Sequence, residues 1–252
     1  IAQIYHLGEH YPDGIWWWAV GTLPFVILTR SRAITWLMTA VALTWLGTET
    51  METFFPVSWP LFAAVLFWFC ISQKESLLLF LTSLVATTFW IEILFARYLG
   101  EDRLFALEEE HLPLTLGLFV LYYALGKWME TQTDRPRIPE YGMALRLWSL
   151  HLGLVVLLTF SFAETWEGVM ELEYDSAGLV WGWLVFVCGI TGYFLYRIWV
   201  ERGPRAWWDD GLSALVYLLF FVLIVLISLA MTEKNENLVV GLQLSGNFAC
   251  LG

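Results

Sequence analysis

The sequence predicts an all-α integral membrane protein, a polytopic bundle of about eight transmembrane helices. The composition is the first observation: 59% of the 252 residues are hydrophobic and 15% are charged, whereas a soluble domain carries about 25% charged residues. Apolar runs also recur along the whole chain, near the length of about 20 residues that a helix needs to cross a bilayer. The third observation is the presence of 16 Trp residues, because Trp collects at the two membrane surfaces.

In chain order, the apolar runs form one expected transmembrane domain that covers residues 1–252. Charged residues, or Pro and Gly, separate each run from the next. The second run is short, and Trp36 and Trp45 can anchor it at the membrane surfaces. The predicted spans are 15–29, 33–48, 55–72, 76–98, 112–129, 143–163, 177–199 and 211–231.

Both ends of the chain have the character of partial apolar segments. Residues 1–5 resemble the tail of an earlier span, and residues 238–252 begin another apolar run. No basic stretch followed by an apolar stretch opens the chain, so residue 1 does not begin a signal peptide. We therefore expect the protein to extend beyond both ends of this sequence.

The basic residues predict the orientation of the bundle. Ten of the 13 Lys and Arg residues lie at the connections that follow the first, third, fifth and seventh spans, while Arg97, Arg103 and Lys234 lie on the opposite side. Short loops rich in Lys and Arg stay in the cytoplasm. We therefore expect a bacterial inner-membrane protein with residue 1 on the outer side. The outer loops are acidic and the net charge is −11, which disfavours a nucleic-acid partner.

Glu92 is the ionisable residue inside the apolar run 76–98. A carboxylate in hydrocarbon destabilises insertion by roughly 2.5–3.5 kcal/mol, so it should face protein or water. Thr88 lies one turn before it and Arg97 lies five residues after it. One interpretation is a cation or proton site formed by Glu92, Thr88 and Arg97. The other is a structural Glu paired with Arg97 or with a Trp N–H group.

We find no established motif for catalysis or metal binding in the sequence, and we therefore expect no catalytic residue, metal or cofactor. His6 to His10 match the H-x-x-E-H spelling of a zinc protease, but Gly8 and Pro12 interrupt the helix that such a site needs. The three Cys residues form no C-x-x-C pair. His151, in the sixth span and nearer its cytoplasmic side, is interpreted as a packing residue rather than a proton relay.

A short N-terminal pattern resembles a known family. The pattern consists of Gln3-Ile4-Tyr5-His6, Trp16-Trp17-Trp18, Leu23-Pro24 and Arg30-Ser31-Arg32. It is similar to predicted bacterial membrane proteins that carry domain of unknown function 2157. The resemblance implies a multi-span inner-membrane protein with further helices before this segment. If the motif marks a site, Gln3, Tyr5 and His6 form an outward polar cluster; otherwise they cap a helix end.

Two functions are consistent with these features. The first is a non-catalytic subunit or scaffold of a membrane assembly, whose partners are the lipid bilayer and other membrane-protein chains. The alternative is a transporter or channel for a cation or small solute, with its site near Glu92. A water-accessible cavity at Glu92 would favour transport, and a buried, paired Glu92 would favour the scaffold.

Overall fold

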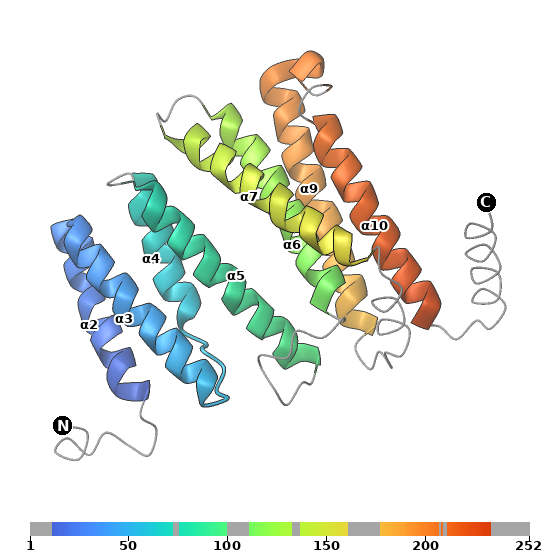
Figure 1. Ribbon diagram of the computed structural model, residues 1–252. Helices are drawn as coiled ribbons and strands as arrows, with labels where there is room; N and C mark the ends of the chain where they lie inside the picture. Colours follow the sequence, from blue (N-terminus) through green and yellow to red (C-terminus); the bar gives the residue numbers. More distant parts are fainter. Residues whose placement is uncertain are drawn as a thin grey trace, which may run out of the picture. The chain divides into compact units, whose positions relative to one another are not determined.

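The fold is entirely helical in the part of the chain that the structure describes, which confirms the predicted all-α class. The structure is a computed structural model that describes residues 12–72, 76–99, 111–132, 137–160, 177–206, 208 and 211–232. These residues form eight helices and no strand (Figure 1). By their contacts the helices group into two compact units, residues 1–106 and 107–252. The prediction of one transmembrane domain stays a prediction.

Unit 1 contains four helices, and the turns between them follow from local backbone chemistry. Pro12 is the first residue of the first helix, where a backbone N–H would have no partner within the helix. The helix ends at Arg30, whose φ of 51° is left-handed. Ser76 precedes the last helix and its Oγ accepts a hydrogen bond from the Leu79 N–H (3.3 Å). The helices are α2 (Pro12–Thr29), α3 (Arg32–Met51), α4 (Trp59–Ser72) and α5 (Leu77–Leu99).

Aromatic contacts show that α4 and α5 of unit 1 run in opposite directions. Phe55, just before α4, lies 5.7 Å from Trp90 near the end of α5, while Phe67 near the end of α4 lies 5.8 Å from Phe80 near the start of α5. The Trp90 indole N–H donates to the Pro56 carbonyl (2.9 Å). These pairs fix the register of α4 on α5.

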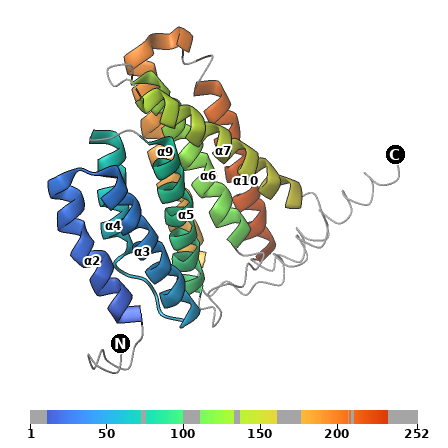
Figure 2. The same cartoon turned by 60° about the vertical axis from the view of Figure 1, so that its left-hand side comes forward.

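Unit 2 is a four-helix bundle organised around α6. Its helices are α6 (His111–Thr131), α7 (Ile138–Thr159), α9 (Ala177–Ala206) and α10 (Leu212–Thr232). Within its apolar stretch 67% of α6 is buried, against 28% for α7 and for α9. The other three helices therefore pack around α6, as the two views in Figures 1 and 2 show.

The directions of the helices in unit 2 follow from their contacts with α6. The Trp183 N–H donates to the Leu114 carbonyl near the start of both helices (3.0 Å), and Trp128 contacts Phe194 near the end of both, so α6 and α9 are parallel. The Tyr123 hydroxyl reaches Ser213 at the start of α10, whereas Gly117 lies against Phe221 further along it. Thus α10 is antiparallel to α6, as an alternating up-and-down chain requires.

Two glycines bring the backbones of α6 and α7 into direct contact. A Cβ atom built on Gly142 of α7 would lie 2.6 Å from the Gly126 carbonyl oxygen and 2.8 Å from the Glu130 amide nitrogen. A Cβ atom on Gly126 would lie 2.7 Å from the Gly142 carbonyl oxygen. Small residues permit this close approach, which is a common way to pack helices in membranes.

The surface of both units is apolar, as expected for helices in lipid. Four helices, α5, α6, α7 and α9, are long and apolar enough to cross a membrane, and two shorter ones, α4 and α10, are also apolar. Large hydrophobic side chains are exposed, among them Phe25 and Leu28 on α2, Leu154 on α7 and Val185 on α9. In a water-soluble protein such a surface would cause association, whereas in a bilayer it faces acyl chains.

The charged residues of α2 and α3 in unit 1 segregate along the two helices. In unit 1, Arg30 and Arg32 lie at the α2–α3 turn, while Asp13, Glu49 and Glu52 lie at the opposite ends of the same two helices. This arrangement agrees with the predicted separation of basic and acidic connections within one unit. Arg135 and Glu173, whose positions would test the topology across unit 2, lie outside the described residues.

Candidate functional site

The described Lys and Arg residues of unit 2 gather at one end of the bundle, which we call the basic end. There α6 ends, α7 begins, α9 ends and α10 begins. The described acidic residues at this end are Glu130, Glu140 and Glu201. The basic residues are Lys127, Arg137, Arg146, Arg197, Arg202 and Arg205.

Glu130, in the last turn of α6, links three helices. The Arg146 Nε of α7 lies 2.6 Å from the Glu130 carboxylate, and both side chains are about three-quarters buried, with 26% and 24% exposed. The Arg202 Nη2 of α9 donates to the Glu130 main-chain carbonyl (3.0 Å). A carbonyl in the last turn of a helix lacks a partner within the helix, and a cation there also complements the helix dipole.

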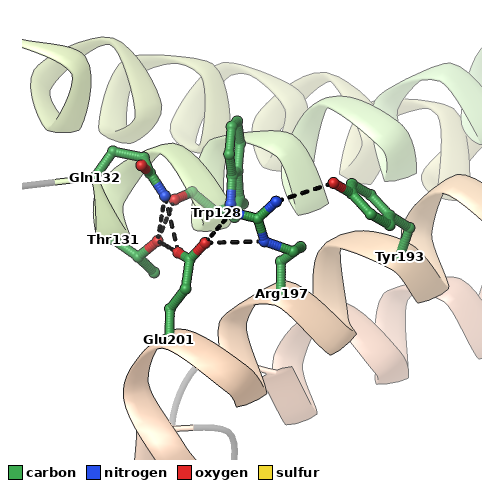
Figure 3. A network of polar contacts seen from close by, with 6 residues as sticks. All are labelled: Trp128, Thr131, Gln132, Tyr193, Arg197 and Glu201. Atoms are coloured by element: carbon green, nitrogen blue, oxygen red, sulfur yellow. Dashed lines mark hydrogen bonds and ion pairs between the residues drawn. The ribbon is translucent and has the colours of Figure 1, made fainter.

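Glu201, near the end of α9, forms a second junction between α9 and α6 (Figure 3). One carboxylate oxygen accepts hydrogen bonds from the Thr131 hydroxyl (3.0 Å) and from the Gln132 amide (2.8 Å) at the end of α6. The other oxygen accepts from the Arg197 Nε one turn earlier on α9 (2.9 Å). The Glu201 carboxylate thus holds the ends of two parallel helices together.

Aromatic rings surround the Arg197 guanidinium. Its Nη1 donates to the Tyr193 hydroxyl (3.1 Å), and its central carbon lies 5.8 Å from the centre of the Trp128 ring on α6 (Figure 3). A guanidinium over an indole face gains a cation–π attraction. Arg197 therefore takes part in the α6–α9 contact through both its charge and its planar face. We call the contacts of Glu130 and Glu201 together the interhelical clasp.

Polar groups continue from the clasp into the interior of the bundle. The Tyr123 hydroxyl of α6 donates to the Ser213 Oγ of α10 (3.0 Å). The Tyr217 hydroxyl of α10 donates to the Ser149 carbonyl of α7 (3.2 Å), and the two tyrosine rings meet edge to face at 5.5 Å. Lys127 is also buried, with 7% exposed. These groups join α6, α7 and α10 at the level where α10 begins.

The chemistry of this end is that of a structural junction with excess positive charge. Carboxylates accept from cationic or neutral donors. The last part of α9 carries two further arginines, Arg202 and Arg205, which are exposed. Among the described residues, no group of three or more His, Cys, Asp or Glu side chains is arranged to hold a metal ion. Nucleophile and base pairs of the kind that acyl-transfer chemistry needs are not among the contacts described above.

The structure places the predicted site near Glu92 on α5. Glu92 is half-buried and engages other groups of the protein. The Thr88 hydroxyl donates to the Leu84 carbonyl within the same helix (2.9 Å). Arg97 is exposed, five residues beyond Glu92, which corresponds to about 140° around the helix. The side chains of Glu92 and Arg97 therefore project from α5 in different directions.

The other residues singled out in the sequence have separate positions. Gln3, Tyr5 and His6 lie outside the described residues. His151 is exposed on α7, and its Nδ1 lies 2.6 Å from the Leu147 carbonyl oxygen. Because α7 begins at Ile138 rather than at residue 143, His151 lies past the middle of its helix and not toward the basic end. The predicted position of His151 nearer the cytoplasmic side of its span stays a prediction.

The clasp was not recognised as a site from the sequence, where its arginines served only to orient the spans. One signal was present, because Arg197 and Glu201 are four residues apart and such pairs meet on a helix. The pairing of Glu130 with Arg146 had no comparable signal. Comparison of the chain with protein-family models, with curated proteins and with solved structures found no match.

Proposed function

We propose that the chain is a non-catalytic membrane scaffold or subunit, in which unit 2 is a rigid anchoring bundle. The interhelical clasp carries this proposal. The Glu201 carboxylate accepts from donors of α6 and of α9 (2.8–3.0 Å). Glu130 of α6 is bonded to α7 through its carboxylate (2.6 Å) and to α9 through its main-chain carbonyl (3.0 Å), so moving α9 along α6 would break several contacts at once. The direct backbone contact at Gly126 and Gly142 holds α7 on α6 in the same way.

The exposed faces of unit 2 supply the surface that a scaffold needs. Leu154, Val155 and Leu158 on α7 are 53–60% exposed, and Val185 and Phe186 on α9 are 69% and 51% exposed. Helices associate in lipid through close packing and through polar groups rather than through the hydrophobic effect. His151 adds such a polar group to the exposed face of α7. Other membrane-protein chains are the proposed partners of these faces.

The proposed location is the bacterial inner membrane, with residue 1 on the outer side and the basic end of unit 2 in the cytoplasm. The support is the positive-inside rule together with the gathering of the described basic residues of unit 2 at one end. Membership of the family with domain of unknown function 2157 remains part of this proposal and rests on the N-terminal pattern.

The scaffold proposal predicts that the chain co-purifies with partners through its exposed helix face. The full chain, tagged and extracted in a mild detergent, should retain the same membrane proteins across repeated preparations. His151→Leu should lower their recovery several-fold, because the change removes the polar group from the exposed face of α7. Leu158→Ile is the matched control, since it keeps an exposed apolar side chain of the same size. Unchanged recovery with His151→Leu, or no reproducible partner, would contradict the proposal.

Glu92 supports a second candidate, a transporter or channel for a cation or small solute. A carboxylate within a 21-residue apolar span is costly to insert, and it is half-buried rather than at the rim. Neutral Thr88 lies one turn away and offers a hydroxyl oxygen as an additional ligand. Such residues in membrane helices often mark ion or proton pathways.

The transport candidate predicts a flux that depends on the charge of residue 92. Proteoliposomes with the wild-type chain should show cation or proton flux above empty liposomes, and Glu92→Gln should lower it at least tenfold. Glu49→Gln is the control, because this acidic residue lies at the end of α3 and outside the apolar span. Equal flux for wild type, Glu92→Gln and empty liposomes would rule this function out.

A further inference from the structure

We propose that Arg202 and Arg205, at the basic end of unit 2, bind the phosphate headgroup of an anionic phospholipid. The inference does not depend on the proposed scaffold function. It begins from a difference among the arginines at this end. Arg146 and Arg197 are each neutralised by a carboxylate, Glu130 and Glu201 respectively. Arg202 and Arg205 are exposed and form no ion pair with any residue that the structure describes.

Arg202 is held in place without losing its charge. One N–H group, on Nη2, donates to the Glu130 main-chain carbonyl (3.0 Å), which is a neutral acceptor. A guanidinium carries five N–H donors, so four remain for other acceptors on this exposed side chain. Arginine presents its donors in a planar fork that fits two phosphate oxygens at once. Arg202 is therefore already ordered and still has the groups that bind a phosphate.

Arg205 lies just past a sharp break in α9. Gly203 has φ 79° and ψ 179°, a conformation that glycine adopts readily and other residues rarely do. The break takes Arg205 off the helical spiral that carries Arg202, so the spacing of the two guanidinium groups is set by this turn. Asp209 and Asp210 follow in the sequence and lie outside the described residues.

The side chains before Arg202 indicate a lipid rather than a soluble anion. Tyr196, Trp199 and Val200 are 51–58% exposed on α9, and the Tyr196 and Trp199 rings lie 6.3 Å apart. Trp and Tyr are typical of the headgroup level. Arg202 follows Trp199 by about 4.5 Å along the helix axis, which is the direction from acyl chains toward phosphate. Basic sites between helices on this side of a membrane bind anionic headgroups.

Charge complementarity supports the same ligand. The described residues of the basic end include six Lys or Arg and three Glu, so these residues together carry a net positive charge. Zwitterionic phosphatidylcholine would gain little there, whereas an anionic lipid such as phosphatidylglycerol would gain the attraction of two guanidinium groups that form no ion pair with a described residue. The structure therefore assigns an acidic phospholipid as the ligand class.

The test is a titration of the purified full chain with palmitoyl-oleoyl phosphatidylglycerol in detergent, read by native mass spectrometry. Wild type should bind this lipid in preference to the phosphatidylcholine of the same chains. Removal of each charge should weaken binding about fivefold, and the double change Arg202→Gln with Arg205→Gln about 25-fold. Arg205→Gln alone touches no contact of the clasp, so it reports on the lipid even if the double variant is less stable.

The controls separate charge, position and ligand source. Arg97→Gln removes an exposed arginine from unit 1 and should leave lipid binding unchanged. Arg202→Lys keeps the charge but loses the planar fork, so its lipid binding should lie between that of wild type and that of Arg202→Gln. Soluble glycerol 3-phosphate at millimolar concentration should not displace the lipid. Equal phosphatidylglycerol binding by wild type and by Arg205→Gln would overturn the proposal. Displacement by glycerol 3-phosphate would overturn the lipid assignment in favour of a soluble phosphate.

Discussion

Replacement of Gly142 by leucine is expected to destabilise unit 2 by about 3 kcal/mol or more, at or above the upper end of the usual range for overpacked cores. The first added carbon would already lie 2.6 Å from the Gly126 carbonyl oxygen and 2.8 Å from the Glu130 amide nitrogen. Both atoms belong to the backbone, so the clash cannot be relieved by a change of side-chain rotamer. The helices α6 and α7 must therefore separate, and the Arg146–Glu130 ion pair beside the contact is weakened as well.

The measurement is reversible unfolding of the purified chain in mixed micelles, followed by tryptophan fluorescence. Gly142→Ala should fall between wild type and Gly142→Leu, at about 1–3 kcal/mol. The matched control is Gly189→Leu, because Gly189 lies on α9 in the same unit and a Cβ there has no neighbour within 4 Å. A leucine facing lipid at that position should change the free energy of unfolding little. Equal effects at 142 and 189 would show that α6 and α7 do not meet at these glycines.

The positions of the helices could be predicted from the sequence because hydropathy and helix length are linked by the thickness of the bilayer. The run 76–98 became α5, Leu77–Leu99, almost unchanged. The largest differences have local causes. Residues 54–56 before α4 have no regular structure and residues 57–58 form a turn, so the helix begins at Trp59 rather than at residue 55. Helix α7 begins five residues earlier than its apolar run, because Pro139 and Glu140 are favourable in a first helical turn.

The contacts between helices could not be predicted in the same way. In lipid, an apolar face has no preference between acyl chains and another apolar helix, so hydropathy carries no information on which helices pair. Gly126 and Gly142 are separated by a connection that includes charged residues. A glycine in a sequence does not indicate which helix packs against it, so their contact could not be predicted. Glu92 could be found because a carboxylate in an apolar run is rare. Glu130 lay in the expected polar end of a span, where a carboxylate is common.

The ion pair between Arg146 and Glu130 is expected to contribute about 1–2 kcal/mol to the packing of α6 and α7, the upper part of the range for polar pairs between membrane helices. In a double-mutant cycle, Arg146→Met, Glu130→Gln and the double variant are compared by unfolding in mixed micelles. Each single change leaves a partly buried partner without its counter-charge, since both side chains are about three-quarters buried (26% and 24% exposed). The double change should therefore destabilise the protein by less than the two single changes added together.

Arg197 and Glu201 provide the matched control for this cycle. They also form an ion pair with a similarly exposed carboxylate, but both residues lie on α9, four positions apart. Membrane helices persist when their tertiary packing is lost, so this pair survives in the unfolded state, whereas the Arg146–Glu130 pair between two helices does not. We therefore expect no measurable coupling between Arg197→Met and Glu201→Gln in the same assay. A coupling at 197 and 201 equal to that at 146 and 130 would mean that the α6–α7 pair does not report on helix packing, and the rigid bundle proposed for unit 2 would lose its electrostatic support.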